Sequence, residues 1–324
     1  MRKIISVFLS LYLFVCMVGC NEKAETQFEM SSVQLPPLLS STNDVELLRN
    51  EGGTLYLNEL DTEANPFLFT TRALHLISIG NDVTRTIEVV SNKRIVDCVI
   101  AFNKLYYFNL VEKNGEFLSE LCYCSVDSEE ITLKEESIKV FSIDDPYAYP
   151  RFVKYGDSYC YKINNCIYDI TNTKPIKEED KDIFISKSVT KKQDLSYKRV
   201  VENGYEIIRL YDGAKIGVDG NIGNFVLIDN NAVYTKDNSV ICFDLEDKSE
   251  RTIYSGNDIF DFSFYNEKYV VISTEKSILC YDFKSNKKVG EVSRPDGSIG
   301  WLYSDSNGNL SMYSSSHIYK FSID

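Results

Sequence analysis

The chain has 324 residues, and its 35 Lys and Arg against 48 Asp and Glu give a formal net charge of −13 at pH 7. Nucleic acid is a poor partner for such a surface, because affinity for nucleic acid comes from cations that neutralise phosphates. The two histidines, His75 and His317, are too few for a His-rich metal site, and their apolar neighbours predict core or edge positions.

The amino terminus has the pattern of an export signal. Arg2 and Lys3 precede the apolar run Ile4–Val18, which is shorter than the ~20 residues of a transmembrane helix. The run ends at Met17-Val18-Gly19-Cys20, which resembles the bacterial lipoprotein box, with Met17 where that box usually has Leu. The resemblance implies a signal peptide over residues 1–19, cleavage before Cys20, and acyl chains (diacylglycerol, palmitate-type) on Cys20. An uncleaved anchor helix and an ordinary signal peptide are the alternatives.

Lipid on Cys20 would hold the protein on a bacterial cell membrane or outer membrane, facing outside the cytoplasm. Without the signal, 33 basic residues face 48 acidic ones, so anionic headgroups would repel the body and the acyl chains must supply the attachment. Residues 20–44 are polar after the cysteine and contain Pro36-Pro37 without a sustained hydrophobic period. They predict a tether of roughly 26 Å span that docks in part on the body, residues 45–324.

From Gly52 onward the chain consists of short runs rich in Val, Ile, Tyr, Phe and Thr, which favour β-strands. Turn signals separate the runs. Asn114-Gly115 and Asn203-Gly204 predict two-residue hairpin loops, because both central residues of such loops need positive φ.

Internal repeats indicate the architecture. Ser239–Leu245 aligns with Ser277–Phe283 without gaps at an offset of 38 residues, and His317–Ile323 follows about 40 residues later. Weaker copies lie at Leu74–Ile77, Leu121–Cys124, Cys166–Asp169 and Ile207–Asp212. Seven units of this length, each holding four short strands, predict an all-β fold, a seven-bladed β-propeller. Six or eight blades, or a pair of β-sandwiches, remain alternatives.

The last unit lacks one strand before the chain stops. We therefore expect a segment within Phe28–Asn50 to complete that blade and close the ring. The units resemble those of bacterial propellers of the YVTN, NHL and quinoprotein-like types, most closely at Asp305-Ser-Asn-Gly-Asn-Leu310 followed by Ile318–Phe321. The repeated tryptophan of quinoprotein units is absent, since Trp301 is the sole Trp, and there is no WD dipeptide.

Cysteine positions predict buried thiols. Seven cysteines remain after Cys20, an odd number, and most lie in apolar runs. Cys122-x-Cys124 could share a soft metal or occupy two core positions. Cys160 and Cys166 flank the Asn164-Asn165 turn in a register that places their sulfurs on opposite faces, which disfavours a disulfide. Asp305-x-Asn307-x-Asn309 begins like a calcium loop but lacks the expected Gly and Glu positions, so a hairpin explains it better. No metal and no cofactor is predicted.

The segment Asp144-Asp145-Pro-Tyr147-Ala-Tyr149-Pro-Arg151 is the candidate ligand-binding stretch. It joins two predicted blades and offers carboxylates, aromatic faces and a cation on a Pro-stiffened loop. Its alternative role is to cap the junction between blades. No catalytic signature is present, so we expect a non-enzymatic binding or scaffold module for protein, peptide or glycan. The alternatives are a carboxylate-dependent glycan-active enzyme and a sensor component that binds a small ligand in the central channel.

Overall fold

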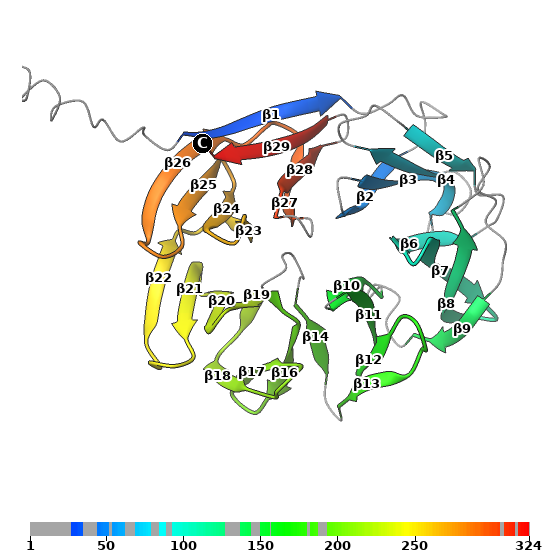
Figure 1. The fold of residues 1–324 in the computed structure, drawn as a ribbon, viewed down its shortest axis with the longest axis horizontal. Helices are drawn as coiled ribbons and strands as arrows, with labels where there is room; N and C mark the ends of the chain where they lie inside the picture. Colours follow the sequence, from blue (N-terminus) through cyan, green and yellow to red (C-terminus); the bar gives the residue numbers. More distant parts are fainter. Residues whose placement is uncertain are drawn as a thin grey trace, which may run out of the picture.

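Seven antiparallel sheets are arranged around a common axis in the computed structural model (Figure 1). The structure describes residues 27–34, 44–51, 54–61, 69–78, 84–88, 93–126, 137–143, 150–155, 157–179, 182–186, 193–304, 308–314 and 317–323. These residues form strands and turns, and among them there is no helix of the length and apolarity needed to cross a membrane. The fold is the predicted seven-bladed β-propeller, so the sandwich, six-bladed and eight-bladed alternatives are wrong.

Each blade is a sheet of four strands, with one short extra strand in blade 5. Blade 1 contains β2 (Asp44–Glu51), β3 (Thr54–Asp61), β4 (Thr70–Ser78) and β5 (Thr84–Glu88). Blade 2 contains β6 (Arg94–Ala101), β7 (Lys104–Lys113), β8 (Glu116–Ser125) and β9 (Ser137–Ser142). Blade 3 contains β10 (Phe152–Tyr155), β11 (Ser158–Ile163), β12 (Cys166–Asp169) and β13 (Pro175–Glu178). Blade 4 contains β14 (Ile183–Ile185), β16 (Ser196–Val201), β17 (Gly204–Arg209) and β18 (Lys215–Asp219).

The remaining blades follow the same order from the axis outward. Blade 5 contains β19 (Ile222–Ile228), β20 (Asn231–Lys236), β21 (Ser239–Asp244) and β22 (Glu250–Ser255), and the two-residue β15 (Gln193–Asp194) pairs with β19 on the axial side. Blade 6 contains β23 (Ile259–Tyr265), β24 (Tyr269–Thr274), β25 (Ser277–Asp282) and β26 (Lys287–Ser293). Blade 7 contains β27 (Ser298–Ser304), β28 (Leu310–Ser314), β29 (His317–Ile323) and β1 (Phe28–Gln34).

The sequence repeats mark the third strand of every blade. The seven repeat segments lie on or extend β4, β8, β12, β17, β21, β25 and β29. In four blades the Asp at the end of the repeat accepts backbone N–H groups of the turn that leads to the outer strand. These residues are Asp169, Asp212, Asp244 and Asp282. The repeated Asp is therefore a turn residue that stabilises the hairpin locally.

The amino-terminal strand closes the ring as predicted. β1 pairs antiparallel with β29, from Phe28 opposite Ile323 to Gln34 opposite His317 (Figure 1). The buried Phe28 ring stacks on Phe321 with 5.7 Å between centroids. A Cβ on Gly290 of β26 would lie 2.5 Å from the Phe28 Cβ, so the glycine lets blade 6 approach the closing strand. β1 lies in the stretch where the sequence predicts a tether that docks in part on the body.

One of the two predicted Asn-Gly loops is correct and one is displaced. Asn114 and Gly115 have φ of 57° and 79° and form the two-residue loop between β7 and β8. In the second case the loop is Glu202-Asn203, because Gly204 already pairs with Val201. A Cβ on Gly204 would lie 2.2 Å from the Val218 carbonyl oxygen, so the glycine serves close strand approach rather than positive φ.

The cysteines lie where the strand pattern places them. Cys160 pairs with Asp169 and Ile163 with Cys166, which is the predicted register, and both thiols are free. Cys122 and Cys124 are buried in the apolar cluster between blades 1 and 2, so they occupy core positions. Burial raises the pKa of the Cys124 thiol to about 11, which keeps it protonated and unreactive near neutral pH.

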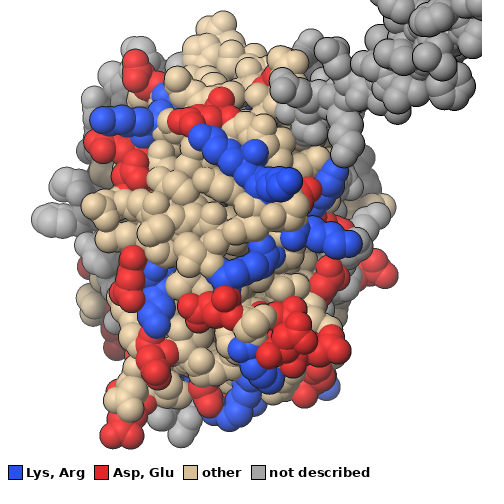
Figure 2. Space-filling model, turned by 90° about the vertical axis from the view of Figure 1, so that its left-hand side faces the viewer, with Lys and Arg blue, Asp and Glu red and all other residues tan. Residues whose placement is uncertain are grey.

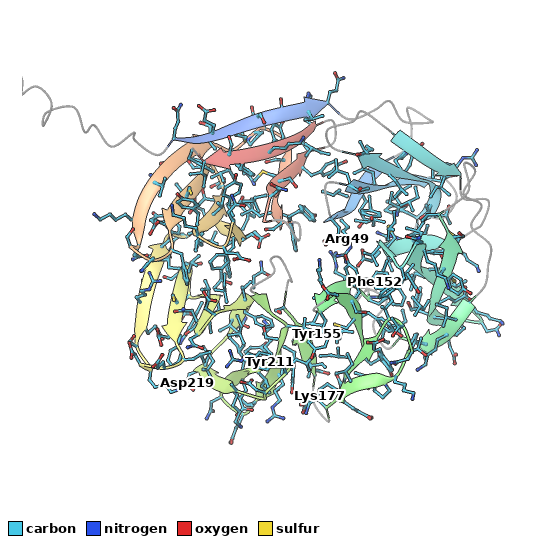
Figure 3. All side chains as sticks on the ribbon, in the orientation of Figure 1. Arg49, Phe152, Tyr155, Lys177, Tyr211 and Asp219 are labelled. Atoms are coloured by element: carbon cyan, nitrogen blue, oxygen red, sulfur yellow. The ribbon has the colours of Figure 1, made fainter. Side chains whose placement is uncertain are left out.

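Two buried aspartates join the innermost strands of neighbouring blades. Asp97 of β6 accepts hydrogen bonds from the Arg49 Nη2 of β2 at 2.8 Å and the Phe152 backbone N–H of β10 at 2.7 Å. Arg49 also donates to the Phe152 carbonyl oxygen, and Figure 3 shows Arg49 and Phe152 near the ring axis. Asp261 of β23 likewise accepts from Asn224 of β19 and from the Leu302 N–H of β27. Each aspartate thus connects three consecutive blades.

Candidate functional site: a charged groove between blades 3 and 4

The candidate site is a groove of about 300 Å³ at the periphery of the ring. One wall is the outer strand of blade 3 and the residue after it, and the other is the β16–β17–β18 face of blade 4. The groove is lined by Lys177, Glu179, Tyr197, Arg199, Ile208, Arg209, Leu210, Gly213 and Lys215. In Figure 3, Lys177 lies at the outer edge of the ring, away from Arg49 near the axis.

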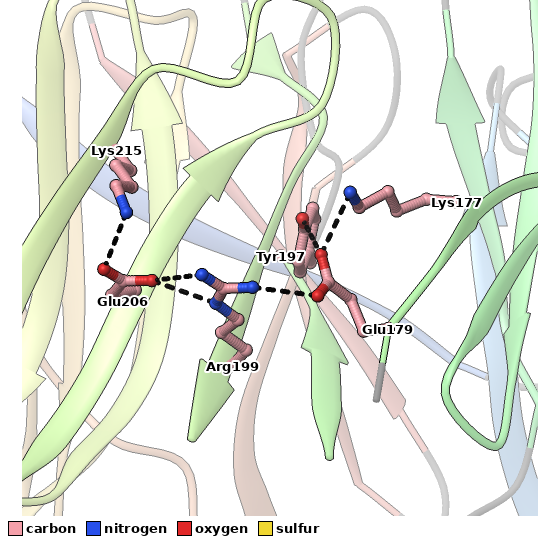
Figure 4. A network of polar contacts seen from close by, with 6 residues as sticks. All are labelled: Lys177, Glu179, Tyr197, Arg199, Glu206 and Lys215. Atoms are coloured by element: carbon pink, nitrogen blue, oxygen red, sulfur yellow. Dashed lines mark hydrogen bonds and ion pairs between the residues drawn. The ribbon is translucent and has the colours of Figure 1, made fainter. Parts of the chain in front are cut away.

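Arg199 is the centre of a polar network that spans both blades (Figure 4). Its Nη1 donates to Glu179 of blade 3 at 2.9 Å, and its Nε and Nη2 donate to Glu206 Oε2 of blade 4 at 2.9 and 2.7 Å. The guanidinium therefore holds two carboxylates that come from different sheets. Such charge-assisted contacts fix geometry more firmly than a single neutral hydrogen bond does.

Further donors complete the network. The Tyr197 hydroxyl donates to Glu179 Oε1 at 2.6 Å, and Lys177 Nζ lies 3.1 Å from the same oxygen. Lys215 Nζ donates to Glu206 Oε1 at 3.0 Å. The Glu179 side chain is only 7% exposed, whereas those of Lys177 and Lys215 are 40% and 55% exposed. Glu179 thus lies deep in the groove, Glu206 binds the lining residues Arg199 and Lys215, and the two lysines flank the groove.

The electrostatics keep both carboxylates ionised. Partial burial opposes ionisation of Glu179, but hydrogen bonds from Tyr197, Lys177 and Arg199 outweigh it and hold the pKa below its usual value. Hydrogen bonds from Lys215 and Arg199 lower the pKa of Glu206. Burial and the bond to Glu179 raise the pKa of Tyr197. Carboxylates with lowered pKa values are suited to charge recognition rather than to donating a proton near neutral pH.

The groove carries an excess of positive charge on an acidic protein. Lys177, Arg199 and Lys215 surround the two glutamates, and Arg209 forms its own pair with Asp212 at 3.1 Å. The Arg209 guanidinium also lies 4.8 Å from the centre of the Tyr211 ring. This arrangement fits an anionic group that approaches between the two flanking lysines.

Other blade junctions have different outer surfaces. Between blades 2 and 3, Lys139 lies over the rings of Phe141 and Tyr168, and between blades 5 and 6, Arg251 lies over Phe283. In those places a single cation covers aromatic rings. On the side of the molecule formed by β22 and β26, acidic and basic side chains are interspersed (Figure 2), as in the exposed pair Lys288–Glu291. Such surface pairs contribute little to stability.

A buried lysine lies at the next junction. Lys198 of β16 is 8% exposed, and its Nζ donates to the Ile222 and Gly223 carbonyl oxygens at 2.6 and 2.9 Å. The Tyr205 ring lies 4.6 Å from the ammonium. Burial lowers the pKa of Lys198 to about 8. The residue connects blade 4 to the innermost strand of blade 5.

The predicted binding stretch is only partly described. Asp144, Asp145, Tyr147 and Tyr149 lie outside the described residues, as do residues 1–19 and Cys20. β9 and β10 flank the stretch, so it joins blades 2 and 3 as expected. Arg151 is exposed and directly precedes the innermost strand β10. Burial raises the pKa of Tyr303 to about 12, and the nearby charge of Arg151 opposes this rise. Arg151 thus lies on the axial side, away from the groove.

The sequence contained a weak signal for the groove. Lys177-x-Glu179 and Tyr197-x-Arg199 place two polar side chains on one face of a strand end. Their convergence needs the packing of two blades, which the spacing does not reveal. The predicted core position of His75 is confirmed: the ring is buried and its Nε2 lies 2.7 Å from Glu59 Oε2. Among the residues that the structure describes, no cluster of three metal-ligating side chains occurs.

Comparison with known proteins supports the fold. No protein-family model and no curated protein matches the sequence. The chain is similar in structure to a chain in the crystal structure of the mitotic checkpoint complex, with 11% identity over 92% of this chain and 95% of that chain and a TM-score of 0.57. It is also similar to the WD40 β-propeller domain of Doa1, with 11% identity over 91% and 97% of the two chains and a TM-score of 0.54. These likenesses show a shared propeller fold.

Proposed function

We propose that this protein is a lipid-anchored, extracytoplasmic propeller that binds an acidic segment of a protein partner in the groove between blades 3 and 4. It acts as a binding or scaffold module rather than as an enzyme. The observation that carries the proposal is the Arg199 network, in which flanking lysines surround two ionised carboxylates. The groove can then exchange part of its internal pairing for pairing with a partner.

The position of the network suits recognition by a rigid surface. Glu179 and Glu206 belong to separate sheets that Arg199 holds together, so the flanking amines of Lys177 and Lys215 are presented on fixed strands. An anionic group between them gains two charge-assisted contacts. Because both amines are exposed, these contacts should affect the association rate and its salt dependence as well as affinity.

Recognition is favoured over proton transfer at this site. A glycan-active enzyme would need one carboxyl group with a raised pKa to serve as the general acid. Among the described residues, every carboxyl group with a resolved shift has a lowered pKa, including Glu179, Glu206 and Asp282. The anchor itself is supported by the lipoprotein-box resemblance at Met17-Val18-Gly19-Cys20.

The groove is tested with a photo-crosslinking amino acid in place of the exposed Tyr211, whose ring contacts the lining residue Arg209, in the full chain on its native membrane. We expect a defined crosslinked partner that disappears when Lys177→Glu and Lys215→Glu are combined. The same probe at the exposed Asp219 serves as the matched control. Equal crosslinking from both positions, or crosslinking that the charge reversals leave unchanged, would contradict the proposed groove.

The anchor is tested separately by Cys20→Ser. Labelled palmitate should enter the wild-type protein and not the variant, and the variant should leave the membrane fraction. A variant that stays membrane-bound without label would show that the amino terminus is an uncleaved helix.

A further inference from the structure

A second candidate site lies on the innermost strands of blades 6 and 7. Phe260 of β23 and Trp301 of β27 are large aromatic residues, 52% and 50% exposed. Each strand is the innermost of its sheet and therefore lies next to the ring axis (Figure 1). An exposed aromatic ring on a rigid strand presents a flat apolar face that a ligand can cover.

Asp261 sets the relative position of the two rings. Its Oδ1 accepts the Phe262 N–H and its Oδ2 accepts the Leu302 N–H, each at 2.9 Å. Phe260 and Trp301 directly precede the two residues that this carboxylate links, Asp261 and Leu302. The register of both strands shifts at these points, between Ile259 and Asp261 and between Ser298 and Leu302. Phe260 and Trp301 therefore lie on the innermost strands of adjacent blades, each one residue before a residue that the Asp261 carboxylate fixes.

Cations accompany the rings. The Arg294 guanidinium lies 4.7 Å from the centre of the Phe260 ring. Gly300, with φ of 75°, leaves the space for this contact, since a Cβ there would lie 2.8 Å from Arg294 Nη1 and 3.2 Å from Phe260 Cβ. Arg151 precedes Phe152, which Asp97 holds in the way that Asp261 holds Leu302. Arg151 in blade 3 and Trp301 in blade 7 therefore have equivalent positions in their blades, each one residue before a backbone N–H that a buried aspartate accepts.

Three nearby acidic groups have other partners, whereas Asp296, two residues after Arg294, is exposed. Glu46 pairs with Arg94 at 3.2 Å, and Asp258 accepts from the Tyr254 hydroxyl at 3.4 Å. The Asp261 carboxylate accepts backbone and Asn224 donors. Within the described part of the chain, neither Arg151 nor Arg294 lies within ion-pair distance of a carboxylate. The site thus combines two aromatic rings with two guanidinium groups.

We propose that Phe260, Trp301, Arg294 and Arg151 form an axial binding site for an acidic oligosaccharide, a chain of sugars that carry carboxylates. The apolar face of a pyranose stacks on an aromatic ring, and a guanidinium binds a sugar carboxylate through two parallel hydrogen bonds. The site is separate from the groove between blades 3 and 4 and does not depend on the function proposed for it.

A peptide fits this surface less well than a sugar. A peptide would add as a strand to the exposed edge of β23 or β27 and would need a regular row of backbone donors. The Phe262 and Leu302 N–H groups are already bonded to Asp261, and both edges are interrupted by register shifts. Such irregular edges disfavour strand addition.

The sole tryptophan of the chain makes the test direct, because intrinsic fluorescence reports on Trp301 alone. Full-length protein in detergent is titrated with trigalacturonate, with maltotriose as the neutral sugar and triglutamate as the acidic peptide. We expect trigalacturonate to change the emission saturably, and maltotriose to bind at least ten-fold more weakly. Raised salt should weaken binding of trigalacturonate.

Variants separate this site from the groove. Arg294→Gln and Phe260→Ala should each weaken trigalacturonate binding at least ten-fold, while Glu206→Gln in the groove should leave it unchanged. Circular dichroism and the urea midpoint verify folding, and Trp301→Phe followed by calorimetry replaces Phe260→Ala if that variant does not fold. The proposal is overturned if trigalacturonate leaves the emission unchanged, if Arg294→Gln binds like wild type, or if triglutamate binds and trigalacturonate does not.

Discussion

Removing the Asp97 carboxylate should destabilise the propeller strongly, because one side chain holds three blades. Asp97 is 2% exposed and accepts from the Cys98 N–H at 2.9 Å, the Phe152 N–H at 2.7 Å and Arg49 Nη2 at 2.8 Å. Asp97→Ala removes the acceptor of the Cys98 and Phe152 N–H groups and the hydrogen-bonded carboxylate of Arg49, which keeps only the longer 3.9 Å contact to Glu51 among the ion pairs of the described residues. Removing one partner of a buried ion pair costs about 3–5 kcal/mol, and we expect a loss of about 4 kcal/mol.

Urea unfolding followed by circular dichroism measures this loss. With an m-value of about 3 kcal/mol/M, a loss of about 4 kcal/mol lowers the midpoint by more than about 1 M. Asp261→Ala should cost less, about 2–3 kcal/mol, because its side-chain donor is the neutral Asn224 rather than an arginine. Asp219→Ala, at an exposed position on β18, should change stability by less than about 0.5 kcal/mol. A loss below about 1 kcal/mol for Asp97→Ala would refute the reasoning.

Three further predictions concern closure and charge. Gly290→Ala should destabilise the fold by about 1–3 kcal/mol and so lower the thermal midpoint, because its Cβ would lie 2.5 Å from Phe28 Cβ. An unchanged midpoint would mean that β1 does not pack there. Burial lowers the pKa of Lys198 to about 8, below its unfolded value of ~10.4. The wild-type unfolding free energy should therefore rise by about 2 kcal/mol relative to that of Lys198→Met between pH 7 and pH 9.5, as measured by urea titration at both pH values. The pKa of Glu206 is lowered in the folded state, so its stabilisation is present above its unfolded pKa of ~4.3 and is lost as pH falls through the folded-state pKa. Glu206→Gln should be about 1 kcal/mol less stable than wild type at pH 7, and urea titrations should show this difference shrinking as pH falls below ~4.3; a pH-independent difference would contradict this.

The sequence predicted the fold through its repeats, because those repeats correspond to one structural position. An apolar third strand lies between its neighbours in every blade, and the Asp that ends it, as in Asp244 and Asp282, forms the following turn. Both requirements are local, so they survive in the sequence as a pattern. The missing fourth strand of the last unit was predictable for the same reason, and β1 supplies it.

The candidate sites were not predictable, because they depend on contacts between blades. Glu179 follows the outer strand of blade 3, and Arg199 lies on the second strand of blade 4, so their pairing requires the angle between two sheets. The displaced hairpin at Glu202-Asn203 has a similar cause, since Gly204 is required by its distance to the Val218 carbonyl oxygen on another strand. Of the predicted binding residues, Arg151 alone is described, and it directly precedes the innermost strand of blade 3.

The two aspartate connections also explain why the axial surface can vary without loss of the fold. Each aspartate binds one residue on either neighbouring blade, and the side chains of interest come one position before these residues and before the aspartate itself. Around Asp97 these preceding residues are Leu48, Val96 and Arg151, and around Asp261 they are Gly223, Phe260 and Trp301. Leu48 and Val96 are buried, whereas Arg151, Phe260 and Trp301 are exposed. Leu48 and Val96 pack in apolar clusters and are fixed by the core, whereas the exposed Arg151, Phe260 and Trp301 can vary without loss of the hydrogen bonds to Asp97 and Asp261. The axial surface and the groove between blades 3 and 4 share none of the hydrogen bonds to Asp97 and Asp261. Variants of the two sites should therefore have additive effects on stability, and each site can be tested with the other intact.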